Sequence, residues 1–290
     1  MNKSNFIHSL MLLLCSVIWG TSFVWQSESV GLIGPITFTA CRFLIGAAVI
    51  LPVVLIVRRV KNKKTKLPVK AGAVCGVVLA IAACLQQVGI QTVSPGKAGF
   101  MTAMYIVLVP VISAFIGKKP RPNVWIAALL AAVGLYLLCI GDDGFAITSG
   151  DIWLIASAFM FAVQILCIDM FIADCDGLEL SMLQFAFCGV CSLIAALFIE
   201  QPTFAHLQSG IAPLLKSGIL SCGIAYSLQT LGQKGLDPTV ASLLMSGESV
   251  FAALAGWIIM DSALSSFELV GCAVMFCAVI LSQVKIRKVK

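Results

Sequence analysis

The sequence predicts an all-α integral membrane protein whose ten transmembrane helices form two inverted five-helix repeats. Three observations lead to this fold class: the scarcity of charged side chains, long windows without any charge, and an internal repeat. Of the 290 residues, 60% are hydrophobic and 11% are charged, whereas a soluble domain averages roughly 25% charged residues. So few polar side chains cannot cover a water-exposed surface, which excludes an ordinary soluble enzyme.

Charge-free windows locate the helices. Residues 4–27, 71–96, 98–117, 122–141 and 180–199 contain no Asp, Glu, Lys or Arg, and about 20 helical residues cross a bilayer core. Windows with one internal charge complete the set, and the short connectors leave no room for a soluble domain. The ten predicted spans lie near residues 7–27, 34–57, 70–92, 98–117, 122–140, 151–172, 178–199, 210–232, 239–259 and 267–284.

Basic residues beside the spans predict the orientation. With the N-terminus inside, Lys97 is the one basic residue in an outer loop, and Arg42 and Lys216 lie within spans. The other Lys and Arg residues fall on the inner side, which is typical of cytoplasmic segments and places both termini in the cytoplasm. The net charge of +6 therefore reports topology, not a nucleic-acid-binding face. One inner connector departs from this pattern because it carries Asp174 and Asp176 without a basic residue.

The twelve cysteines do not indicate a disulfide framework, because they are scattered through apolar spans as small hydrophobic residues. Cys188 and Cys191 form a CxxC pair inside a span, but a redox or zinc site needs polar surroundings and a second pair. The chain has only two histidines and no phosphate-binding loop or recognisable catalytic set. We therefore expect no metal, no cofactor and no enzymatic activity.

An internal repeat sets the architecture. Gln86 matches Gln229 and Gly89 matches Gly232 at an offset of 143 residues, and at the start of each half the offset is 142. Each half holds five spans. Because five is odd, the second half begins on the opposite face of the membrane, so the repeats are inverted. We expect the two domains to be residues 1–141 and 142–290.

Inverted repeats favour a transporter, since many carriers hold a substrate near the midplane between two such halves. The alternative is that duplication only doubled a stable helical unit.

Four segments carry a resemblance to a known family. They are SVIWGTSF at 16–23, CRFL at 41–44, the stretch 97–110 from KAGF to VP, and GESVFAAL at 247–254. In this order they resemble the EamA family of the drug/metabolite transporter superfamily. The resemblance implies a ten-helix carrier of the bacterial plasma membrane, often an exporter of amino acids or related metabolites, with a cavity lined by spans 1, 3, 4, 6, 8 and 9.

Glu248 is the main candidate for a coupling or substrate-binding group. It lies near the centre of the ninth span, where an ionised side chain is costly and calls for an explanation. Three roles are open: a proton-binding site, a counter-ion for a cationic or amino substrate, or a structural acid paired with a polar group of another helix.

Arg42 is a second intramembrane charge, about one turn from the middle of the second span. Its long side chain can reach the outer interface or a carboxylate such as Glu28. Since the resemblance puts span 2 at the periphery, a structural or gating role is favoured over recognition of a substrate carboxylate.

Polar and aromatic residues at helical spacing mark a lining for the predicted cavity. Trp19, Ser22 and Gln26 share one face of the first span, and their repeat partners Phe161 and Gln164 start the same face in the sixth. The alternative is that such amides join helices together. Further predicted lining residues are Gln86, Gln87, Tyr105, Tyr226 and Gln229.

These features predict a secondary carrier that exports amino acids or related small metabolites by alternating access, with proton coupling and homo-oligomer formation left open. Its expected partners are a small-molecule substrate and the lipid bilayer, and no nucleic acid. The first alternative is efflux of lipophilic cationic drugs, with Glu248 as counter-ion and an aromatic wall. The second, from another class, is a membrane enzyme or sensor without net transport.

Overall fold

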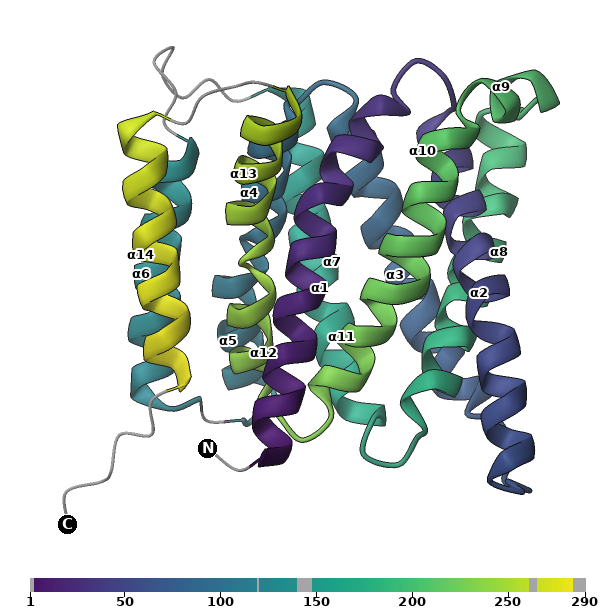
Figure 1. The fold of residues 1–290 in the computed structure, drawn as a ribbon, viewed down its shortest axis with the longest axis horizontal. Coiled ribbons are helices and arrows are strands. Elements are labelled where there is room, and N and C mark those ends of the chain that lie inside the picture. The colour runs from purple at the N-terminus through teal and green to yellow at the C-terminus, as the bar shows by residue number, and fades with distance from the viewer. Residues whose placement is uncertain (1–2, 119, 140–147, 261–264, 284–290) are drawn as a thin grey trace.

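The computed structural model describes residues 3–118, 120–139, 148–260 and 265–283. In these ranges every regular element is a helix, and the helices run side by side between two ends of the bundle where the connectors gather (Figure 1). The predicted all-α fold is confirmed.

The first half contains five spans. Three of them are single helices, the fourth is divided in two, and the fifth is shorter. In order they are α1 (Lys3–Glu28), α2 (Pro35–Val60), α3 (Val69–Ile90), α4 (Pro95–Ala103) with α5 (Tyr105–Phe115), and α6 (Pro122–Cys139).

The second half follows the same plan, with one added short helix, α9, in a connector. Its third span contains a π-helical segment, η1, and its fourth span is again divided in two. In order the elements are α7 (Ser149–Phe171), α8 (Gly177–Ile199), α9 (Phe204–Ser209), α10 (Ile211–Lys216) with η1 (Ser217–Ala225) and α11 (Tyr226–Gln233), α12 (Pro238–Met245) with α13 (Glu248–Met260), and α14 (Ser266–Gln283).

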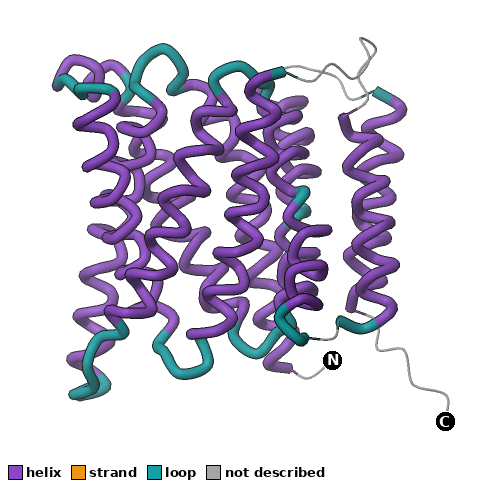
Figure 2. Tube along the Cα trace, turned by 180° about the vertical axis from the view of Figure 1, so that it is seen from behind, coloured by secondary structure: helices purple, strands orange, loops and turns teal. Residues whose placement is uncertain are grey.

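Ten spans result, as the sequence predicts. Within the described residues, eight helices or divided helices are long and apolar enough to cross a bilayer, and two shorter apolar helices lie at Pro122–Leu137 and Leu269–Leu281. The start of α1 and the end of α14 lie at the same end of the bundle (Figures 1 and 2). The expected boundary between residues 141 and 142 falls outside the described residues.

Glycine contacts demonstrate the inverted symmetry between the halves. A methyl group on Gly89 would lie 2.6 Å from Leu154 Cγ, and one on Gly232 would lie 2.8 Å from Leu12 Cγ. Leu12 and Leu154 are 142 residues apart, and the two glycines are 143 apart. Each half therefore packs the end of its third span against the first span of the other half.

The pair α2 and α8 is fastened in a related way at its two ends. At one end the Glu200 carboxylate accepts hydrogen bonds from the backbone N–H groups of Ile36 and Thr37, at 2.7 and 2.8 Å, and from the Thr37 hydroxyl at 2.6 Å. These N–H groups lie in the first turn of α2 and have no acceptor within the helix, and a negative charge is favourable at this end of a helix. At the other end Arg58 Nη1 donates to Glu179 Oε1 at 2.8 Å. Arg58 and Thr37 are the repeat positions of Glu200 and Glu179.

The acidic connector that departed from the charge pattern is compensated by basic residues of the first half. Lys63 Nζ lies 3.2 Å from Asp176 Oδ2 and 2.9 Å from Glu179 Oε1, and Lys118 forms an ion pair with Asp169. The hydrogen bond to Glu179 raises the pKa of Lys63. Burial works against ionisation of Asp176, but Lys63 and the N–H groups at the start of α8 outweigh it and lower the pKa of Asp176.

Candidate functional site

The fourth span of each half is broken at the same repeat position. Met104 separates α4 from α5, and Ser246 and Gly247 separate α12 from α13. At the breaks the chain makes tighter i to i+3 hydrogen bonds, from Met104 N to Met101 O at 3.3 Å and from Ser249 N to Ser246 O at 3.2 Å. One interruption is visible about halfway along the bundle in Figure 2. The sequence predicted continuous spans here, so both breaks are corrections to that prediction.

Tyr105 and Glu248 are the first residues after the two breaks, and both are buried. Glu248 is 10 residues from Pro238 and 12 from Met260, which places it about 15–18 Å from either end of its span at 1.5 Å per residue. Such a carboxylate is too deep to reach water at either interface. Broken helices near the midplane are where many carriers bind their substrates.

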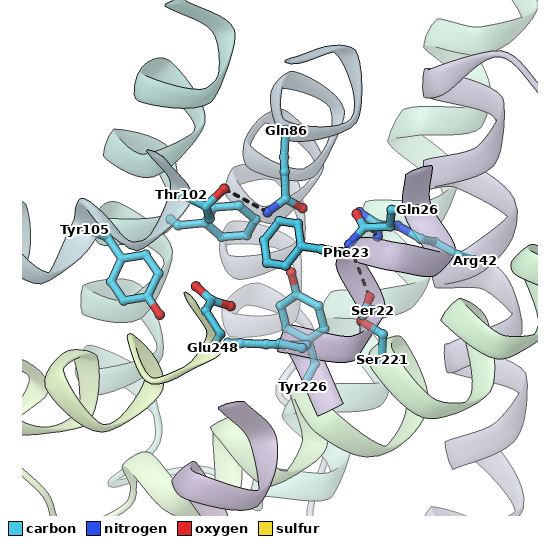
Figure 3. Close-up of a pocket in the computed structure, with 12 residues that line it drawn as sticks. Ser22, Phe23, Gln26, Arg42, Gln86, Thr102, Tyr105, Ser221, Tyr226 and Glu248 are labelled. Atoms are coloured by element: carbon cyan, nitrogen blue, oxygen red, sulfur yellow. Dashed lines mark hydrogen bonds between the residues drawn. The ribbon is translucent and has the colours of Figure 1, made fainter. Parts of the chain in front are cut away.

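A pocket lies between the halves, where the two broken spans meet α1 and α11. The space free of protein atoms in and around it is about 320 Å³, open solvent included, and nine of the twelve predicted site residues line it. Figure 3 shows Arg42 and Gln26 toward one side of this pocket and Tyr105 and Glu248 toward the other. The lining residues are Trp19, Ser22, Phe23, Gln26, Arg42, Gln86, Thr102, Tyr105, Phe161, Ser221, Tyr226 and Glu248.

Polar side chains of the first half form a connected wall. Gln26 Nε2 donates to Ser22 Oγ at 3.1 Å, and Gln26 Oε1 accepts from Arg42 Nη1 at 2.6 Å (Figure 3). Elsewhere in the lining, Gln86 Nε2 donates to Thr102 Oγ1 at 3.2 Å (Figure 3). Gln26 is therefore held from two sides, which fixes the amide that orients the Arg42 guanidinium.

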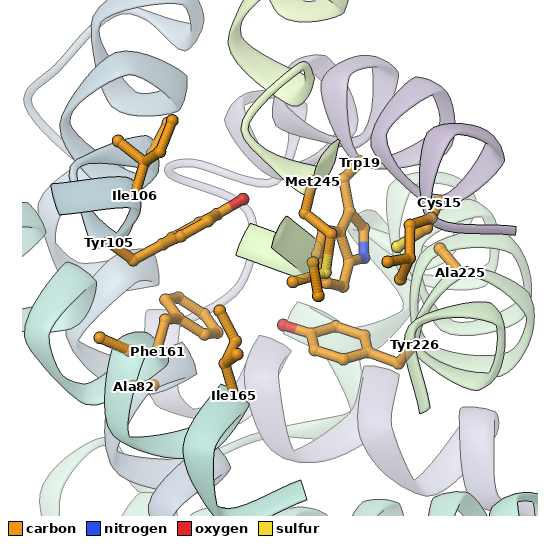
Figure 4. Close-up of a cluster of buried hydrophobic side chains, with 14 of the residues drawn as sticks. Cys15, Trp19, Ala82, Tyr105, Ile106, Phe161, Ile165, Ala225, Tyr226 and Met245 are labelled. Atoms are coloured by element: carbon orange, nitrogen blue, oxygen red, sulfur yellow. The ribbon is translucent and has the colours of Figure 1, made fainter. Parts of the chain in front are cut away.

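Aromatic rings form another part of the wall. Trp19 and Tyr226 meet edge to face with ring centroids 4.6 Å apart, and Phe43 packs on Tyr226 at 5.3 Å. Figure 4 shows Tyr226 beside Trp19, and Tyr105 and Phe161 on the other side of the same group of buried side chains. Edge-to-face pairs of this kind stabilise the arrangement of the rings beyond simple burial.

Several polar atoms of the lining are buried without a hydrogen-bond partner among the described residues. They are Trp19 Nε1, Arg42 Nε, Arg42 Nη2, Tyr105 Oη and Glu248 Oε1. Since an unpaired buried polar group is unfavourable, such a cluster indicates that a ligand or water completes the site. No group of three or more His, Cys, Asp or Glu suited to a metal ion occurs in the part of the chain that the structure describes.

Three predicted residues lie outside the lining because they join helices. Gln87 Nε2 donates to Gln26 O and Ser29 Oγ, both at 3.2 Å. Gln164 Nε2 donates to Gln184 Oε1 at 3.3 Å, and Gln229 Nε2 donates to Gln164 Oε1 at 3.1 Å. For these amides the alternative reading, contact between helices, describes the structure.

Three lining residues were missing from the sequence prediction. Phe23 follows Trp19 by four residues and Thr102 precedes Tyr105 by three, so helical spacing carried a signal for both. Ser221 lies in η1. A π-helical segment shifts the faces of a helix, and no periodicity in the sequence announces it.

Arg42 lies in a different place from the one the sequence suggested. Its side chain is 1% exposed and lines the pocket, and the outer carboxylate Glu28 pairs with Lys216 at 3.4 Å. The guanidinium carbon is 5.6 Å from the Phe38 ring centroid and 5.2 Å from that of Phe43. Arg42 thus extends inward from α2 toward Gln26 (Figure 3).

Comparison with known proteins identifies the family. The model of the EamA-like transporter family matches the chain twice, once in each half, at residues 7–140 and 148–283. Together the two matches cover nearly the whole chain. The chain belongs to this family. The resemblance found in the sequence is therefore confirmed, and this EamA-like transporter is a multi-pass membrane protein that carries a small-molecule substrate.

Its relatives agree with this assignment. An uncharacterized transporter of Archaeoglobus fulgidus is 27% identical over 278 residues, covering 96% of this chain and 86% of the relative. The uncharacterized transporter YwfM of Bacillus subtilis is 26% identical and covers 98% of this chain and 96% of its own length. A solved crystal structure has the same fold, with a TM-score of 0.77 at 22% identity over 95% of this chain and 96% of that chain.

Proposed function

We propose that this EamA-like transporter is a secondary carrier that exports amino acids or related small metabolites by alternating access. The observation that carries the proposal is the pocket between the halves, which has unpaired buried polar atoms on several of its walls. A solute that supplies the missing hydrogen bonds would bind there more favourably than at any apolar surface of the helices.

The geometry supports alternating access because both halves contribute to one pocket. Trp19 and Gln26 come from the first half, and Tyr226 and Glu248 come from the second. Rocking of one half against the other would open this pocket to each side in turn while its lining stays together. The basic residues at the end of the bundle that holds the start of α1 support a cytoplasmic location for that end, in a bacterial plasma membrane.

Efflux of lipophilic cations is the second candidate. The Glu248 carboxylate together with the Trp19 and Tyr226 rings favours it, because both attract a cation. Against it stands Arg42 in the same lining, whose positive charge repels a ligand that carries only a cation.

A flux assay in proteoliposomes tests the proposal. The purified protein is reconstituted, and counterflow of labelled amino acids and of organic cations is measured with and without a pH gradient. We expect saturable counterflow of one or more amino acids, absent from protein-free vesicles, and a response to the gradient if protons are coupled. Counterflow of cations alone would replace the proposal by its alternative, and no flux of any solute across a broad panel would contradict a transport function.

A further inference from the structure

One edge of the Arg42 guanidinium has no partner. Nη1 donates to Gln26 Oε1, whereas Nε and Nη2 are buried without a hydrogen bond among the described residues. Nε and Nη2 lie on the same edge of the planar group, and their two N–H bonds form the fork that binds a carboxylate through both oxygens.

The surroundings hold this edge in position. The Phe38 and Phe43 rings lie 5.6 and 5.2 Å from the guanidinium carbon, and the Gln26 amide fixes Nη1. Among the ion pairs of the described residues, none involves Arg42: Glu28 pairs with Lys216, and Glu200 binds the start of α2. The protein therefore presents a buried cation whose carboxylate partner does not come from the described part of its own chain.

The other side of the pocket carries a buried carboxyl group. Glu248 is 3% exposed, and its Oε1 atom has no hydrogen-bond partner among the described residues. Figure 3 shows Phe23 and Tyr226 between the Glu248 side and the Arg42 side of the pocket. A ligand that reaches both sides meets the Arg42 guanidinium, the rings of Phe23 and Tyr226, and the Glu248 carboxyl group.

We infer that the pocket binds a zwitterion, with the ligand carboxylate on the Nε and Nη2 edge of Arg42 and the ligand ammonium group at Glu248. This inference rests on the proposed function and specifies its site. A zwitterion gives both the Arg42 guanidinium and the Glu248 carboxyl group a partner of complementary charge, whereas an amine leaves Arg42 unpaired and a simple carboxylic acid leaves Glu248 unpaired. Arg42 is then a substrate-binding residue, in contrast to the structural or gating role that the sequence favoured.

Binding to the purified protein tests the inference independently of flux. The twenty standard amino acids and 6-aminohexanoate, whose charged groups stand at the two ends of an apolar chain, are screened by isothermal titration. Each one that binds is compared with its amine lacking the carboxylate and its acid lacking the amino group. Leucine, 3-methylbutylamine and 4-methylpentanoate are one such set. We expect the amino acid to bind at least about 10-fold more tightly than either analogue, the effect of losing a charge-assisted hydrogen-bonded partner.

Two variants assign the ends of the ligand. Arg42→Gln is expected to weaken amino acid and acid binding about 10- to 100-fold without weakening amine binding. Glu248→Gln is expected to weaken amino acid and amine binding and leave the acid unchanged. Arg42→Lys keeps the charge without the fork and is the second variant if Arg42→Gln fails to fold. It should bind the amino acid and the acid more weakly than wild type does. Arg59→Gln, an exposed arginine of the same helix, is the control.

The outcomes separate this inference from the proposed function. Equal losses of affinity for all three ligand types in both variants would overturn the inference. It would also be overturned if none of the amino acids bound. Selective binding without counterflow would keep the zwitterion site and contradict the carrier. Counterflow of solutes that lack the ammonium or the carboxylate group, at rates equal to those of zwitterions, would support the carrier function and contradict the zwitterion site.

Discussion

Tyr105 and Glu248 are 143 residues apart, each directly follows a break in the fourth span of its half, and both line the same pocket. The backbone symmetry of the repeat thus brings two unlike groups, a phenol and a carboxylate, to one place. Only the second half contributes an acid at this position, so the two halves are equivalent in fold and different in chemistry.

Glu248→Gln is the variant that tests this asymmetry in transport. It replaces the buried carboxylate by an amide of the same shape, and we expect counterflow to fall at least about 10-fold, or its response to a pH gradient to disappear, because neither proton binding nor charge pairing survives. Glu28→Gln removes a half-exposed carboxylate at the end of α1 and serves as the control. Counterflow equal to wild type with an unchanged pH response would remove Glu248 from the mechanism.

Gly89→Ala tests the packing between the halves. A methyl group there would lie 2.6 Å from Leu154 Cγ and 2.9 Å from the Gly150 carbonyl oxygen, so the free energy of unfolding should fall by about 1–3 kcal/mol. Gly96→Ala is the matched control, since no atom lies within 4 Å of its new methyl group. Thermal unfolding in detergent provides the comparison, and equal melting temperatures for the two variants would show that α3 and α7 do not pack as described.

Glu200→Gln tests the fastening of α2 to α8. The carboxylate accepts hydrogen bonds from two backbone N–H groups and the Thr37 hydroxyl, and an amide has one accepting oxygen and no charge. We expect a loss of about 1–2 kcal/mol in stability, similar to the removal of a helix cap. Gln201→Ala changes the neighbouring residue as a control, and a wild-type melting temperature for Glu200→Gln would argue against the cap.

The ionisation of Asp176 should make the stability of the protein depend on pH. Burial opposes its ionisation, but Lys63 and the N–H groups of Leu178 and Glu179 lower its pKa overall. Its contribution is therefore present above the pKa of the unfolded chain, about 3.9, and is lost as the pH falls through the lower folded value. Melting temperatures between pH 3 and 7 should show a smaller acid-induced decrease for Asp176→Asn than for wild type. Parallel curves would contradict the pairing with Lys63.

The spans were predictable because lipid dissolves only apolar helices, so scarce charge is itself a structural signal. The breaks at Met104 and Gly247 were not, because they need only a few altered hydrogen bonds and no proline. Glu248 was found because its charge is isolated within one span. The position of the Arg42 side chain was not predictable, because it depends on two tertiary contacts. Arg42 donates to Gln26 of another helix, and Glu28 forms its ion pair with Lys216 instead.

The central claim is that one pocket between the halves faces the two sides of the membrane in turn. Ser221 lines this pocket and is 2% exposed, so Ser221→Cys in a cysteine-free, transport-competent protein reports its access. A membrane-impermeant thiol reagent added to the medium reaches the outer face of the protein in right-side-out vesicles and the cytoplasmic face in inverted vesicles. We predict that it modifies the cysteine in both preparations, and that a transported amino acid slows both reactions. Modification from one side only, with or without substrate, would contradict alternating access.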